Sequence, residues 1–175
     1  MNLDISVECD LWNEAEVRVV TKDSLDAAFS IVEPNLLDEN KFRKSAIEIC
    51  FLFTNDYEVR LLNKTYRGID KPTNVLSFPT NSTLPKIDGD CLEEKDAPIC
   101  VLGSVALAYE TIKRESLDQS KSMENHLKHL IVHSMLHLLG HSHDDPVAAE
   151  KMESLEIVIL RKLNVSNPYQ RIEVV

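Results

Sequence analysis

The stretch CVLGSVALA (Cys100–Ala108) decides the predicted fold class, because this apolar run of strand length stands directly before the long helical patterns of the chain. Those helical patterns cover Tyr109 to about Glu115, Met123–Leu139 and Pro146–Leu163. Earlier stretches typical of strands are DISVECDLW (4–12), SAIEICFLF (45–53) and NVLSFPT (74–80). Strands therefore gather early and long helices late. The pattern predicts an α+β fold with one mixed sheet of about four strands, covered by about five helices.

Two shorter helical patterns lie between the early strands. The first should start near Asp23 or Ser24 and run through LDAAFSIVE until Pro34 stops it. The second covers roughly residues 56–66, with apolar side chains at spacings of three and four, and Gly68 should end it.

Composition indicates a compact folded protein, with 43% hydrophobic and 27% charged residues, four Gly and seven Pro. At 175 residues, we expect a single domain over 1–175. The chain contains no CxxC pair, so the cysteines are interpreted as reduced thiols: Cys9, Cys50, Cys91 and Cys100. We find neither a signal-like N-terminus nor an apolar run of about 20 residues, so a cytoplasmic location without a membrane partner is expected.

The net charge of −10 argues against binding of nucleic acid over the whole surface. Any contact with RNA should therefore be local. Basic residues cluster at Lys64, Arg67 and Lys71, whereas acidic residues gather in the polar stretch 80–98, mainly between 88 and 96. This asymmetry permits a basic cleft on an acidic protein.

The segment HSMLHLLGHSH (133–143) predicts a metal site at a helix end. Residues four apart in a helix project from one face, so His133 and His137 can share one ion. A left-handed turn at Gly140 would bring His143 back toward them. Three imidazole nitrogens leave a fourth position open, as catalytic zinc requires. We predict one metal ion per chain, although three imidazoles suit Zn, Ni, Cu or Fe alike.

Some histidines of this region have a simpler interpretation. His126 and His129 are assigned to an exposed helix face or to the wall of a cleft, without a ligand role.

The spacing of the three ligands matches the metalloprotease motif HExxHxxGxxH, but Ser134 stands where that motif has its Glu base. Its hydroxyl should pack or bond within the helix. A bound metal still lowers the pKa of water to about 7, so hydrolysis does not require that Glu.

With LNKTYRGIDKPTNVLSFP (62–79) as a second block, LG at 102–103, and Met152 and Glu153, the chain resembles the YbeY family of bacterial metal-dependent endoribonucleases. The likeness runs from about residue 62 to 163. It implies that the metal ligands are His133, His137 and His143, with zinc as the ion, and that Arg67 is catalytically important. It further implies cleavage of single-stranded RNA in maturation of the 3′ end of 16S ribosomal RNA and in ribosome quality control. Ribosomal RNA and the small subunit would be partners, and no DNA is expected.

The chain departs from the usual family pattern at three places. His141-Ser142 stands where the family usually has Tyr-Asp, and Asn74 and Ser104 each stand where it usually has Asp. The first change removes an acceptor that could orient an imidazole beside His143. Asp144 or Asp145 could replace that acceptor, and His141 is an alternative third ligand.

The cleft residues have two interpretations each. Arg67 is expected to grip the phosphate, since a planar guanidinium stabilises growing charge on phosphate oxygens; alternatively it is solvated near a helix end. Lys71 is either a candidate RNA contact or a surface lysine. Tyr66 and Phe78 either stack on bases or pack in the core.

Three functions remain open from the sequence. The first is the endoribonuclease, and the second is a metzincin-like metalloprotease that lacks the usual Glu base. The third is a non-catalytic ribosome-assembly factor stabilised by zinc. The missing Glu argues against the second, and a three-ligand site argues against the third, because structural zinc is normally four-coordinate.

Overall fold

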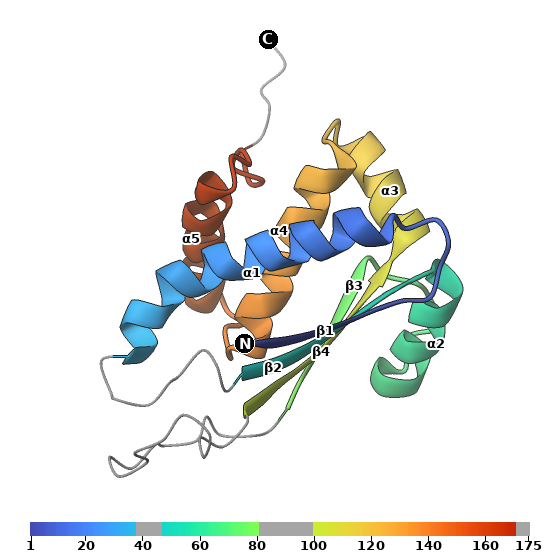
Figure 1. Cartoon of the computed structure of the whole chain (residues 1–175), viewed down its shortest axis with the longest axis horizontal. Helices are drawn as coiled ribbons and strands as arrows, with labels where there is room; N and C mark the ends of the chain where they lie inside the picture. The colour runs from blue at the N-terminus through green and yellow to red at the C-terminus, as the bar shows by residue number, and fades with distance from the viewer. Residues whose placement is uncertain (38–46, 81–99, 171–175) are drawn as a thin grey trace.

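The computed structural model describes residues 1–37, 47–80 and 100–170 (Figure 1). Its strands are β1 (Asn2–Val7), β2 (Ile47–Thr54), β3 (Val75–Pro79) and β4 (Cys100–Ala108). Its helices are α1 (Glu14–Leu37), α2 (Asp56–Arg67), α3 (Tyr109–Asp118), α4 (Met123–Leu138) and α5 (Pro146–Lys162). The expected α+β fold is confirmed, and β4 has the bounds that the sequence predicted.

The sheet has the order β1-β2-β4-β3 and is mixed, as expected. β1 and β4 both run parallel to β2, whereas β3 runs antiparallel to β4. Burial alternates along β2, where Ile47, Ile49, Phe51 and Phe53 are buried on one face. This alternation directs the apolar residues of the inner strands toward a single layer of helices.

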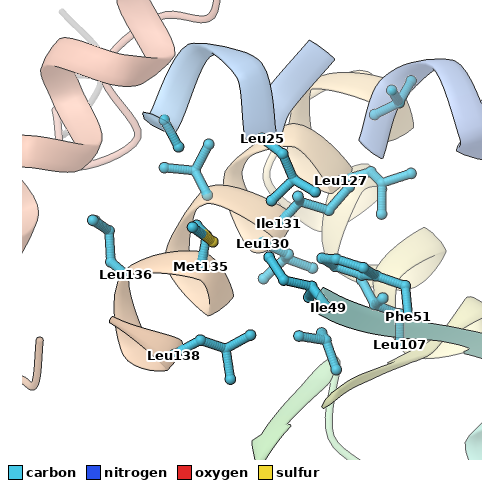
Figure 2. Packing of buried hydrophobic residues seen from close by; sticks show 14 of the residues in the cluster. Leu25, Ile49, Phe51, Leu107, Leu127, Leu130, Ile131, Met135, Leu136 and Leu138 are labelled. Carbon is cyan, nitrogen blue, oxygen red and sulfur yellow. The ribbon is translucent and has the colours of Figure 1, made fainter. Parts of the chain in front are cut away.

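That layer contains α1, α4 and α5, which lie on one side of the sheet (Figure 1). Figure 2 shows Leu127, Ile131 and Met135 of α4 packed between α1 and strand residues such as Ile49. Helix α2 covers the opposite face, where its Val59 joins a smaller apolar cluster. Helix α4 is therefore held at the centre of the helical layer, with its apolar stripe buried.

Local capping explains where several helices begin and end. The Ser122 hydroxyl accepts a hydrogen bond from the Asn125 amide at 3.1 Å and so caps α4. Pro146 occupies the start of α5, where its fixed φ suits a helix. Gly68 ends α2 in the left-handed conformation with φ 72°, as the sequence predicted.

The prediction for α1 was wrong at both ends. The helix begins at Glu14 rather than near Asp23 or Ser24, and it continues past Pro34 to Leu37. Val17 and Val20 lie in this earlier part and are buried in the core. Their β-branched side chains lower helix propensity, but burial outweighs that preference.

Two other sequence predictions concern parts that are only partly described. Residues 81–99, which contain most of the acidic stretch and Cys91, are outside the described residues. The side chain of Cys100 is also not described. Cys9 and Cys50 are free thiols, as expected. No helix in the described parts of the chain is both long enough and apolar enough to cross a membrane.

Candidate metal centre

The three predicted ligands converge at the C-terminal end of α4. His133 and His137 project from adjacent turns, and Gly140 reverses the chain with φ 89°. The His141 amide donates to the Leu136 carbonyl at 3.0 Å and closes this turn. His143 returns to the pair, so that one ring nitrogen from each histidine lies within 4.8 Å of the other two. The turn predicted at Gly140 is confirmed.

Hydrogen bonds fix the tautomers of two of these rings. The Nδ1–H of His133 donates to Oε1 of Glu156 at 2.7 Å, and the Nδ1–H of His137 donates to the His141 carbonyl at 3.0 Å. Burial, together with the nearby His133, lowers the pKa of His137 and favours its neutral form. In its neutral form, each ring therefore has its lone pair on Nε2.

The two Nε2 atoms lie 3.0 Å apart. When both rings are neutral, the two lone pairs face each other and repel unless a cation lies between them. Tetrahedral zinc, with Zn–N near 2.0–2.1 Å, separates its ligand nitrogens by about 3.3 Å. The side chains of His133, His137 and His143 therefore fit a metal ion of this kind.

Glu156 on α5 lies directly behind this site, and no part of it is exposed to solvent. Besides His133, its carboxylate accepts hydrogen bonds from His129 Nε2 at 3.3 Å and from the Tyr169 hydroxyl. Burial alone would raise the pKa of Glu156, but these three hydrogen bonds lower it to about 2. The carboxylate is thus ionised and holds the imidazole of His133 with Nε2 toward the other two ligands.

Sequence reasoning missed Glu156 and Tyr169. A signal for Glu156 was present, because it lies on the same face of the helix as three apolar residues at spacings of three and four. These residues are Met152, Ile159 and Leu160, and all are buried. An acid on the apolar stripe of a helix needs buried partners. Tyr169 lies beyond α5 and has no comparable local signal.

The alternatives around the third ligand have other places in the structure. His141 is absent from the three-histidine cluster in the described part of the chain and contributes its carbonyl to His137. Burial lowers the pKa of the His141 side chain. Asp145 caps α5 by accepting from the amides of Val147 and Ala148, and Asp144 is exposed.

A cavity of about 350 Å³ opens beside the histidines. Arg67, at the end of α2, lines it together with the three candidate ligands. The Arg67 side chain is exposed and makes no hydrogen bond or ion pair with the residues that the structure describes. Arg60 and Lys64 of the same helix differ, because Asp70 binds both at 2.6 and 2.8 Å. The guanidinium of Arg67 is therefore free to meet an anion in the cavity.

Two further histidines of α4 form part of the cavity wall. His126 is only 3% exposed and His129 is partly buried, so the expectation of an exposed helix face was wrong. Their expected place in a cleft wall is confirmed. Ser134 is fully buried and its hydroxyl has no hydrogen-bond partner among the described residues, so it packs within the helix and cannot act as a base.

Other predicted residues lie away from the cavity. The exposed Lys71 is not among the residues that line it. Tyr66 and Phe78 contact each other edge to face, with ring centroids 5.1 Å apart, in a separate hollow that also contains Ser104. Tyr66 is 66% exposed, so the core interpretation was wrong for it, whereas Phe78 packs against the small cluster under α2.

Fold and site together define a class of protein: an α+β protein with an open three-histidine site at a helix end, beside a cavity lined by an arginine that has no ion-pair partner in the described part of the chain. The family model described as Endoribonuclease YbeY matches residues 10–164, and the chain belongs to this family.

Relatives and a solved structure agree with this assignment. A protein named endoribonuclease YbeY from Erythrobacter litoralis is 41% identical, with coverage of 95% of this chain and 98% of its own. One of the same name from Agrobacterium fabrum is 40% identical, covering 97% of this chain and 95% of its own. A solution structure from Thermotoga maritima has a TM-score of 0.53 at 18% identity, covering 97% and 99% of the two chains. That likeness supports the fold alone.

Proposed function

We propose that this protein is a zinc-dependent endoribonuclease of the cytoplasm that cleaves single-stranded RNA. We further propose that it acts in maturation of the 3′ end of 16S ribosomal RNA and in ribosome quality control, with the small ribosomal subunit as partner. The main support is the convergence of three imidazoles beside a cavity that is also lined by Arg67. The names of the relatives support RNA as the substrate.

The side chains that would hold the ion are His133, His137 and His143, with Glu156 fixing the ring of the first. A bound divalent cation would supply Lewis-acid polarisation of a phosphoryl oxygen and a lowered pKa, about 7, for a water molecule. Glu156 complements this positive charge from the buried side and leaves the cavity side open for substrate.

Arg67 supplies the second positive charge of the site. During attack on a phosphodiester, negative charge grows on the equatorial oxygens, and a planar guanidinium can bind two of them at once. An arginine already bound to a carboxylate would first have to break that ion pair. Arg67 has no such partner among the described residues, so its full charge is available to the phosphate.

Two other functions are less well supported. A metalloprotease of the usual kind needs a carboxylate base after the first ligand, and the buried Ser134 cannot provide it. A purely structural zinc is normally closed by a fourth protein ligand, often cysteine. The cluster found in the described part of the chain contains three histidines and no cysteine.

The deciding experiment compares three substrates with purified protein, with and without a chelator. We expect cleavage of single-stranded RNA that stops on chelation and returns with zinc, little cleavage of duplex RNA, and none of casein. Intact RNA in the presence of bound zinc would contradict the proposal. Cleavage of casein would favour the metalloprotease, and loss of stability alone on chelation would favour the structural role.

Arg67→Ala should separate metal binding from cleavage. We expect an unchanged zinc content and a fall in kcat/KM on RNA of about a hundredfold, since loss of one preorganised donor typically has an effect of this size. Arg60→Ala in the same helix is the matched control, because Arg60 is bound to Asp70 and does not line the cavity. Loss of zinc from Arg67→Ala would instead show a structural role for the arginine.

A further inference from the structure

A second polar cluster lines the same cavity at a distance from the histidine triad. Its centre is Glu115 of α3, whose Oε2 accepts hydrogen bonds from Asn74 Nδ2 at 2.9 Å and from His126 Nε2 at 2.8 Å. All three residues line the cavity. His126 stands seven residues before His133 on α4, which corresponds to about 10 Å along the helix axis. The His126 end of this cluster therefore lies about two helical turns from the first candidate ligand.

The donors around Glu115 are clearly assigned. Asn74 Oδ1 accepts from the Val75 amide at 2.7 Å, which leaves its amino group to face Glu115. Burial lowers the pKa of His126, so its ring is neutral and donates its single N–H, on Nε2, to the carboxylate. Both donors meet Oε2. Oε1 of Glu115 has no hydrogen-bond partner among the residues that the structure describes, and the side chain remains 30% exposed.

An acidic side chain is unexpected in a cavity that must admit a polyanion. A carboxylate repels phosphate, so Glu115 can contribute to substrate binding only if the substrate offers it a group that donates hydrogen bonds. In RNA, such donors lie on the bases, and a carboxylate suits the exocyclic amino group of cytosine. Lys121 and Gln119 line this part of the cavity, and the Lys121 ammonium lies 2.9 Å from Gln119 Oε1. A lysine here can offset the repulsion between Glu115 and a neighbouring phosphate.

We propose that Glu115 reads the base of a nucleotide next to the cleaved bond, by accepting a hydrogen bond on Oε1 from an exocyclic amino group. The inference rests on the proposed ribonuclease function and specifies its substrate. Cytosine offers N4–H at the place where uracil has the O4 acceptor, so the site favours cytosine over uracil. The cavity, at about 350 Å³, falls in the size range of small-ligand sites.

A purely structural role for Glu115 predicts something different. Its hydrogen bonds join α3, α4 and the residue before β3, and such a link could serve stability alone. Glu115→Gln distinguishes the two roles. The glutamine oxygen can still accept from Asn74 and His126, while its amino group replaces the free oxygen. The atom offered to the base then changes from acceptor to donor, which favours the O4 atom of uracil.

The experiment measures kcat/KM on pairs of short single-stranded RNAs that differ by one cytosine or uracil at each position flanking the cleaved bond. At one position we expect wild-type protein to prefer cytosine by about three- to tenfold, the range for one net hydrogen bond. Glu115→Gln should reverse that preference. Glu110→Gln, a change on the same helix outside the cavity, should retain it.

A second measurement uses wild-type protein only and does not depend on folding of the variant. N4,N4-dimethylcytidine at the same position lacks an N–H donor and should lose the advantage of cytosine. Three results would overturn the proposal that Glu115 recognises the base. These are equal rates for cytosine and uracil at every position, a preference of the wild-type protein for uracil, or an unchanged preference in Glu115→Gln. If no RNA is cleaved at all, the proposed ribonuclease function fails, and the proposed recognition of the base fails with it.

Discussion

The hydrogen bond between Glu156 and His133 joins a candidate metal ligand to the protein core, because Glu156 has no exposed surface. A carboxylate in this position acts on the ring in two ways. It selects the tautomer with a lone pair on Nε2, and its negative charge makes that nitrogen a better ligand. The hydroxyl of Tyr169 and the ring of His129 hold the carboxylate in turn.

Glu156→Gln tests this role at the scale of one residue. The amide loses the negative charge and has only one acceptor oxygen for three donors. We expect zinc affinity to fall by about ten- to a hundredfold, the usual range for such partners, as measured by competition with a chromophoric chelator. Glu153→Gln, on the exposed side of the same helix, is the control and should bind zinc normally. Equal zinc affinities in the two variants would exclude a positioning role for Glu156.

At the scale of elements, the site depends on one turn. Helix α4 supplies two ligands, and the reversal at Gly140 supplies the third with φ 89°. A side chain at this glycine would meet no atom within 4 Å, so any penalty of substitution arises from backbone conformation alone. Gly68 after α2 has the same features, with φ 72° and open space around it.

This similarity makes Gly140→Ala and Gly68→Ala a matched pair. Each should lower the free energy of unfolding by about 1–2 kcal/mol, since an L residue is disfavoured in the left-handed region. Only Gly140→Ala should also weaken zinc binding, because only this turn places His143. Calorimetry of the metal-free proteins and zinc titration measure the two effects separately. Equal zinc affinity in both variants would show that His143 is placed by other contacts.

Features that depend on residues close together in the sequence were predicted correctly, whereas features that depend on contacts between distant segments were missed. The turns at Gly68 and Gly140 and the strand β4 were predicted correctly, because their signals lie within a few neighbouring residues. The start of α1 was missed, because its β-branched first turns are stabilised by burial in the core. Glu156 and Glu115 were missed as well, because their partners come from other helices and from the residue before β3.

At the scale of the whole molecule, the cavity combines a small positive region with an acidic protein. Side chains from α2, α3, α4 and the segment after α5 line it, so segments far apart in sequence build one wall. Among the described residues that line it, the cationic side chains other than histidines are Arg67 and Lys121. The chain as a whole has a net charge of −10. RNA should therefore be attracted in the cavity and repelled over much of the remaining surface.

This charge distribution predicts a weak dependence of RNA binding on salt. Each phosphate neutralised on a single strand contributes about −0.7 to the slope of log K against log salt concentration, so the two cationic contacts of the metal-free protein give a slope near −1.4. Titration of a fluorescent single-stranded RNA at several salt concentrations measures it. Arg67→Ala should reduce the slope by about 0.7. Arg60→Ala should leave it unchanged, because Asp70 already neutralises that side chain. A slope of about −4 or steeper would mean that RNA follows a longer basic track outside the cavity.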